Sequence, residues 1–97
     1  MFKLIVAILP KGKIKAVMPA VKDAGIFGAT MLSGTGLCTE EGKRALGVRI
    51  GTAREILLLL TLDANTDKLI TLLEKHGSLK DPGQGIVFVA DISKVVG

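Results

Sequence analysis

The chain has 97 residues, the size of one ordinary domain, which leaves no room for a catalytic domain beside a separate regulatory one. Hydrophobic residues make up 48% of it and charged residues 23%, a balance that excludes an intrinsically disordered protein. We therefore expect a single domain over residues 1–97. Because a domain this small hides only about 60 to 65% of its unfolded surface, the surplus of apolar residues favours an oligomer.

The chain is basic, with 13 Lys and Arg residues against 9 Asp and Glu and a formal net charge of +4. Such a charge suits an anionic partner. Trp and Tyr are absent and only three Phe are present, which argues against a surface that stacks nucleic-acid bases. All the arginines, Arg44, Arg49 and Arg54, fall in one short stretch. We therefore expect a small anion or an acidic protein surface as the partner, and no nucleic acid.

The single cysteine, Cys38, excludes an intrachain disulfide and a zinc site built on a cysteine pair. No apolar run approaches the roughly 20 residues that cross a bilayer, and the apolar N-terminus meets Pro10 without a signal-peptide cleavage site. We expect a cytoplasmic protein without a transmembrane segment. His76 closes a predicted helix, where it can cap carbonyl groups, and Cys38 has no base nearby in sequence. The sequence therefore predicts no catalytic residue and no resident metal.

The apolar periodicity predicts a strand, a helix, a strand, a long loop, a strand, a helix and a strand. Pro19 lies inside the first helix and has no N–H to donate, so we expect a kink or break there. Gly25 suits the end of this helix, Asn65 or Thr66 suits the start of the second helix, and Gly77 its end. The predicted strands cover residues 2–9, 28–32, 55–62 and 86–89, and the predicted helices cover 14–25 and 66–77.

This order predicts an α+β, ferredoxin-like βαββαβ fold with an antiparallel sheet. Both helices should cover one face of the sheet. The strands at 2–9 and 55–62 are apolar on both faces, so the second face would be left bare. We expect Ile5, Ala7 and the leucines of 56–60 to lie on that face and to be buried against neighbouring subunits.

Residues 33–54 form a predicted loop far longer than a hairpin turn, and such loops are usually functional or mobile. Two glycine turns lie at sheet ends, Gly34-Thr35-Gly36 and Gly83-Gln84-Gly85. Neither has the spacing of a Walker loop or of a dinucleotide fingerprint. Backbone N–H groups in such turns can bind an anion, and arginines can assist as bidentate partners. The turns are therefore candidates for an anion site.

Several stretches are typical of one family. In chain order they are Lys3-Leu4-Ile5-Val6-Ala7-Ile8, Val21-Lys22-Asp23-Ala24-Gly25, Gly28-Ala29-Thr30-Met31-Leu32-Ser33-Gly34-Thr35-Gly36, the long loop, and Pro82-Gly83-Gln84-Gly85-Ile86-Val87-Phe88-Val89-Ala90-Asp91. With them the chain resembles the PII nitrogen-regulatory signalling family, and specifically its short PII-like members, over nearly its full length. The resemblance implies a homotrimer with inward-packed sheets. It also implies an adenine nucleotide (ATP, ADP or AMP) in clefts between subunits, and a mobile T-loop that docks on a membrane transporter or metabolic enzyme.

Carried over by position, the resemblance places the site residues on three segments. Thr30, Gly34, Thr35 and Gly36 would line one wall of the cleft, Gly83, Gln84 and Gly85 would cradle phosphates from the other, and the partner-reading loop tip would comprise Glu40, Glu41, Lys43, Arg44 and Arg49. Ile86 stands where nitrogen-sensing members carry a lysine, and no Tyr is present for uridylylation. These departures argue against 2-oxoglutarate sensing and against tight ATP binding.

Two other functions remain open on the same topology. A trimeric metal-binding protein resembling the divalent-cation-tolerance proteins would use Cys38 with Glu40 or His76. An enzyme of acylphosphatase type would need an arginine within a glycine turn, and neither glycine turn contains one.

Overall fold

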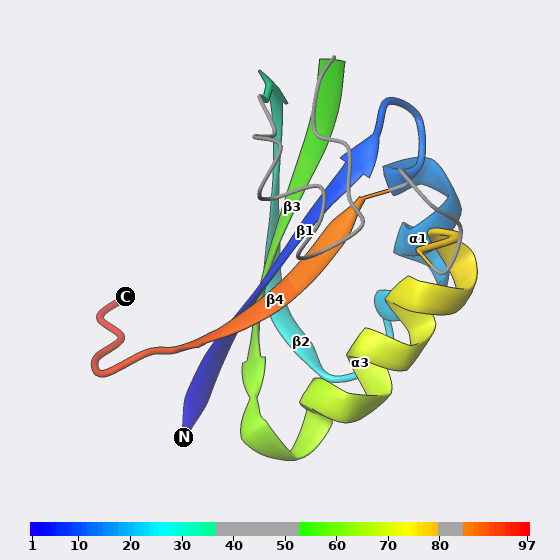
Figure 1. Cartoon of the computed structure of the whole chain (residues 1–97). Coiled ribbons are helices and arrows are strands. Elements are labelled where there is room, and N and C mark those ends of the chain that lie inside the picture. Colours follow the sequence, from blue (N-terminus) through cyan, green and yellow to red (C-terminus); the bar gives the residue numbers. More distant parts are fainter. Residues whose placement is uncertain (37–52, 80–84) are drawn as a thin grey trace, which may run out of the picture.

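A computed structural model describes residues 1–36, 53–79 and 85–97. Within these ranges, four strands form one antiparallel sheet, and two helices lie together on one side of it (Figure 1). The elements are β1 (Phe2–Pro10), α1 (Ile14–Val21), β2 (Ile26–Thr35), β3 (Ala53–Leu62), α3 (Asp63–His76) and β4 (Ile86–Asp91). The predicted α+β class and the ferredoxin-like βαββαβ order are confirmed.

The sheet has the order β2-β3-β1-β4, so β1 and β3 are its central strands. These two strands carry apolar residues on both faces, a pattern typical of strands that are covered on both sides. Register places Ile5 opposite Leu59 and Ala7 opposite Leu57, and these four side chains are fully buried. They form the core together with Leu9 and with residues of the two helices: Ile14, Val17, Val21, Leu69 and Leu73.

The face away from the helices differs from the sequence-based assignment. Ile5 and Ala7 of β1, and Leu57 and Leu59 of the predicted set at 56–60, lie beneath the helices and not on the bare face. The alternate residues of each strand, Leu58 and Leu60 among them, point away from the helical layer. We call the second face the open face. Matched by register across the four strands, its rows are Gly28, Leu60, Leu4 and Ala90, then Thr30, Leu58, Val6 and Phe88, then Leu32, Ile56, Ile8 and Ile86.

Helix α1 is shorter than predicted. It continues through Pro19, so the expected break does not occur at that residue, and it ends at Val21 rather than near Gly25. The N–H of Lys22 still bonds to the Met18 carbonyl, and the Ala24 N–H then closes a tighter turn on Val21. Gly25, with φ of +94°, serves the turn into β2 instead of ending the helix.

Helix α3 begins earlier than predicted, at Asp63 directly after β3. Its N-cap is therefore Leu62, and the predicted caps Asn65 and Thr66 lie inside the helix with their side chains bonded elsewhere. The Thr66 hydroxyl donates to the Asp63 carbonyl (2.8 Å), and the Asn65 amide donates to the Gly25 carbonyl (3.4 Å). The predicted end is correct, since His76 is the last helical residue and the Gly77 N–H bonds to the Leu73 carbonyl.

Strands β2 and β3 extend further than predicted. Ser33 to Thr35 pair with Ala53 to Glu55, so these residues of the predicted 33–54 loop belong to the sheet. Pairing satisfies the backbone N–H and C=O groups that the two strands turn toward each other, which a loop would leave to solvent. Residues 37–52 lie outside the described ranges.

Candidate functional site

The register of the sheet brings several predicted cleft residues to one end of it. Gly34 on β2 lies opposite Arg54 on β3, and Arg54 lies opposite Pro10 on β1. On the other side of β1, Ile8 pairs with Ile86, so Gly85 enters β4 beside the end of β1. We call this region the glycine end; it comprises Gly34, Thr35, Gly36, Arg54, Pro10 and Gly85.

The two glycine segments lie on opposite edges of the sheet. Gly34 belongs to β2 and Gly85 precedes β4, and these are the outer strands. Three strand spacings of about 4.8 Å separate the edges by roughly 14 Å. One copy of the chain therefore presents the two segments on different sides of its sheet.

Glycine is required at position 85 by its surroundings. Its φ is +145°, and a Cβ atom there would lie 2.1 Å from the Ile8 carbonyl oxygen. The backbone of β4 therefore starts in direct contact with β1. Gly34 is also close-packed, since a Cβ would lie 3.2 Å from Ile56 Cδ1. Thr30 and Thr35 on β2 are exposed, as a wall open to a ligand must be.

Glu55 lies at the glycine end on the helix side of β3, and the sequence analysis did not identify it as functional. Its Oε1 accepts hydrogen bonds from the backbone N–H of Gly12 (2.7 Å) and of Ile14 (3.4 Å). The described helix α1 has no acidic residue in its first turn, and Lys13 at its N-cap makes no side-chain capping bond. Glu55 therefore supplies the negative charge that a helix N-terminus favours. The local sequence gives no signal for it, because 41 residues separate Glu55 from Ile14.

A cluster of charges joins three elements at the other end of the sheet. The Lys3 ammonium donates a hydrogen bond to Asp91 and lies 3.8 Å from Asp63 Oδ1, which connects β1 with β4 and with the start of α3. The hydrogen bond to Asp91, followed by the charges of Asp91 and Asp63, raises the pKa of Lys3 against the opposing effect of desolvation. Each charge has a partner, and both carboxylates are largely exposed, so the cluster is a surface contact between the three elements.

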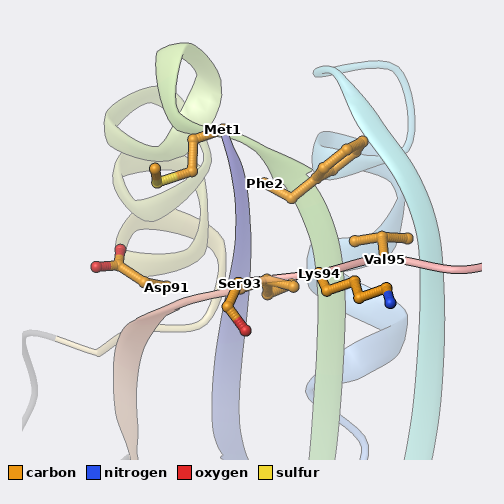
Figure 2. A pocket seen from close by; sticks show the side chains of 7 residues that line it. Met1, Phe2, Asp91, Ser93, Lys94 and Val95 are labelled. Atoms are coloured by element: carbon orange, nitrogen blue, oxygen red, sulfur yellow. The ribbon is translucent and has the colours of Figure 1, made fainter.

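A pocket of about 470 Å³ also lies at this second end. Figure 2 shows Ser93, Lys94 and Val95 on the C-terminal segment, which crosses in front of β1 and β3 near Phe2. The Ile92 N–H bonds to the Phe2 carbonyl (3.2 Å). Phe2 and Pro10 stand at opposite ends of β1, roughly 26 Å apart, so this pocket is not the predicted cleft. Its lining residues are Met1, Phe2, Asp91, Ile92, Ser93, Lys94 and Val95.

Several predicted residues lie outside the described ranges. They are Glu40, Glu41, Lys43, Arg44, Arg49, Gly83 and Gln84, together with Cys38 and therefore most of the alternative metal site. Among the described residues, no group of three or more His, Cys, Asp or Glu side chains is placed to hold a metal ion. Neither helix in the described ranges is long and apolar enough to cross a membrane.

Comparison with known proteins agrees with the resemblance found in the sequence. A crystal structure of Arabidopsis thaliana PII bound to citrate superimposes with a TM-score of 0.73 at 22% identity, covering 95% of this chain and 78% of that chain. This match shows the fold. No curated protein sequence matches the chain significantly. The family model for nitrogen regulatory protein P-II matches residues 2–97, which is nearly the whole chain. The chain therefore belongs to the nitrogen regulatory protein P-II family.

Proposed function

We propose that this protein is a non-enzymatic PII-like signalling protein of the cytoplasm, built as one domain over residues 1–97. It binds a small effector, an adenine nucleotide, in clefts between subunits, and it controls a membrane transporter or metabolic enzyme of nitrogen regulation through the loop 33–54. Membership of the P-II family supports the regulatory class. The observation that carries the cleft is the placement of Gly34 and Gly85 on opposite edges of the sheet but at the same end.

The open face supports a homotrimer. Leu4, Val6 and Ile8 of β1 lie opposite Leu60, Leu58 and Ile56 of β3, which makes a continuous apolar centre on the face opposite α1 and α3. Phe88 on β4 and Leu32 on β2 extend it and are 46% and 48% exposed. A contiguous apolar surface of this kind on a folded domain marks an interface. A ring of three copies would bury it and would bring the β2 edge of each copy toward the β4 edge of the next.

The proposed cleft then has two walls from two copies. Thr30, Gly34, Thr35 and Gly36 form the wall on β2, and Gly83, Gln84 and Gly85 form the wall that receives phosphates. Backbone N–H groups next to glycine can approach an anion closely because no Cβ intervenes. Ile86 supplies no charge to this turn. We therefore expect weaker phosphate binding than a lysine at that position would give, and no response to 2-oxoglutarate.

In the proposed complex, the loop tip contacts the partner protein through Glu40, Glu41, Lys43, Arg44 and Arg49. These residues carry both signs of charge, which suits a specific protein surface more than a general anion. Because β2 ends at Thr35 and β3 begins at Ala53, the loop continues directly from the β2 wall of the cleft and returns into the neighbouring strand β3. Effector occupancy can thereby bias the loop between partner-binding and free states.

The test combines light scattering with calorimetric titration of ATP, ADP, AMP and cyclic AMP. The wild-type protein should be a trimer and should bind at least one of these nucleotides below millimolar concentration. Thr35→Glu places a negative charge on the cleft wall and should weaken binding by about tenfold or more. Thr71→Glu, on the exposed side of α3, is the matched control and should bind as the wild type does. Failure of all four nucleotides to bind below millimolar concentration overturns the proposal.

A further inference from the structure

Strands β2 and β3 continue past their neighbours at the glycine end. Thr35 pairs with Ala53, whereas β1 ends opposite Arg54 and β4 begins opposite Ile8. We call the paired residues Ser33–Thr35 and Ala53–Glu55 the ribbon. Leu9 and Pro10 of β1 flank Glu55 and Arg54, so only the Thr35–Ala53 pair extends beyond β1 as a two-stranded ribbon, which alone is marginally stable in water. The direction of this ribbon therefore depends on contacts outside its own pairing.

Glu55 supplies such a contact. Its backbone lies in β3 between Leu9 on β1 and Ser33 on β2. Its carboxylate reaches the turn between β1 and α1, where it accepts the Gly12 and Ile14 N–H groups. That turn is itself held, because the Lys13 N–H bonds to the Pro10 carbonyl (3.1 Å). Hydrogen bonds from amides to a carboxylate are roughly twice as strong as neutral ones.

We propose that Glu55 is a positioning residue for the candidate cleft. By fastening the ribbon to the start of α1, Glu55 fixes where Ser33–Thr35 stand relative to the rest of the sheet. Its connection to ligand binding rests on the proposed function, in which Gly34, Thr35 and Gly36 form one wall. The mechanical part, that the Glu55 side chain holds the ribbon, depends only on the geometry of one subunit.

A simple capping role for Glu55 makes a different prediction. If the carboxylate only capped α1, its loss would disturb Gly12, Ile14 and the first turn of the helix and would leave β2 unchanged. If it positions the ribbon, the disturbance must pass through the Ser33–Glu55 pair into β2. The middle of β2, around Thr30, pairs with the central residue Leu58 and should remain unaffected in either case.

Amide hydrogen exchange measured by NMR on the full chain separates the two roles. In Glu55→Ala we expect exchange about tenfold faster or more at Gly12 and Ile14 and at the β3-paired amides of Ser33–Thr35. Glu55→Gln keeps one acceptor oxygen and should restore part of the protection in both places. Asp67→Ala removes an exposed carboxylate on α3 and should change neither. Faster exchange at Gly12 and Ile14 with unchanged Ser33–Thr35 overturns the proposal.

Exchange in Glu55→Gln and titration with ATP complete the test. If Glu55→Ala does not fold, Glu55→Gln alone should show the same two-site pattern with smaller changes, and a change limited to α1 overturns the proposal. Titration with ATP separates it from the proposed function. If exchange at Ser33–Thr35 becomes faster in Glu55→Ala but the protein binds no ATP, the positioning role is supported and the nucleotide function is overturned. If the protein binds ATP and exchange at Ser33–Thr35 is unchanged in Glu55→Ala, the nucleotide function is supported and the positioning role of Glu55 is overturned.

Discussion

Ser78 is the only non-glycine residue with positive φ, at 56°, in the part of the chain that the structure describes. It follows the last turn of α3, and the Leu79 N–H closes that turn on the Glu74 carbonyl (3.1 Å). For a residue with a Cβ, this left-handed backbone conformation costs about 1 kcal/mol. The end of the helix therefore carries strain at a position where glycine is usual.

We expect Ser78→Gly to raise the free energy of unfolding by about 0.5 kcal/mol, because relief of the strain exceeds the added flexibility of the unfolded chain. Urea denaturation measures the change. Ser93→Gly, in the C-terminal segment, should leave stability within about 0.5 kcal/mol of the wild type. A loss of stability in Ser78→Gly would mean that the hydroxyl contact with Lys13 Nζ (3.5 Å) matters more than the backbone.

The ion pair of Lys3 with Asp91 should give a distinct dependence on pH. The pKa of Lys3 is raised in the folded protein, chiefly by its hydrogen bond to Asp91. A raised pKa stabilises the fold below the unfolded pKa of Lys3, and this stabilisation is lost as pH rises through the folded pKa. Asp91→Asn should therefore lower the melting temperature at pH 7 and should matter progressively less above pH of about 10.4, the ordinary pKa of lysine.

Thermal unfolding of both proteins between pH 7 and pH 11 tests this expectation. Asp67→Asn is the control, since Asp67 is exposed on α3 and should not change the alkaline profile. A constant difference between Asp91→Asn and the wild type across this range would show that the carboxylate acts without the Lys3 charge.

At the scale of elements, periodicity predicted which segments are strands and helices but not which face of β1 meets the helices. Both alternating sets of β1, Leu4 with Val6 and Ile5 with Ala7, are apolar, so a shift by one residue is invisible in the pattern. The predicted end of the first helix was wrong for a related reason. Gly25 resembles a helix end locally, yet it serves a turn against Asn65, whose side chain lies where a Cβ would be.

Helix α1 tolerates Pro19 without ending there, which makes its stability testable. Pro19 cannot donate to the Lys15 carbonyl, and proline inside a helix costs about 3 kcal/mol relative to alanine. Pro19 is exposed, so its replacement leaves the core intact. We expect Pro19→Ala to raise the free energy of unfolding by about 1–3 kcal/mol and to increase the helical circular dichroism signal.

Ala16→Gly is the control for this prediction, because it changes an exposed position of the same helix in the opposite direction. It should lower stability by about 1 kcal/mol. Should Ala16→Gly behave so while Pro19→Ala brings no gain, the ring of Pro19 would be making contacts that offset its missing N–H.

At the scale of the whole molecule, the candidate site divides into a part that the sequence predicts and a part that it does not. The glycine segments came from motif resemblance. Their separation onto opposite edges follows from strand order, which no local pattern contains. The role of Glu55 could not be predicted from local sequence, because its hydrogen-bond partners Gly12 and Ile14 are distant in sequence. Local sequence patterns thus identify the segments of the site, whereas strand pairing across the sheet determines which of their residues lie close together.

The open face gives the most direct test of the proposed assembly. Val6 stands at its centre, between Leu58 on β3 and Phe88 on β4, and points away from the helical core. A charge there is solvated in a free subunit but loses water when a second copy covers it, and such burial costs several kcal/mol per ion. Val6→Glu should therefore weaken assembly by about a hundredfold or more while the subunit keeps its fold.

Light scattering at several concentrations, together with circular dichroism, measures both properties of Val6→Glu. A folded monomer is the expected result, and Thr71→Glu on the exposed side of α3 should remain assembled as the wild type does. A folded, assembled Val6→Glu would place the interface elsewhere. In that case burial of the open face would not bring the β2 edge of one copy to the β4 edge of the next. The two glycine segments would then not form the walls of one ligand site.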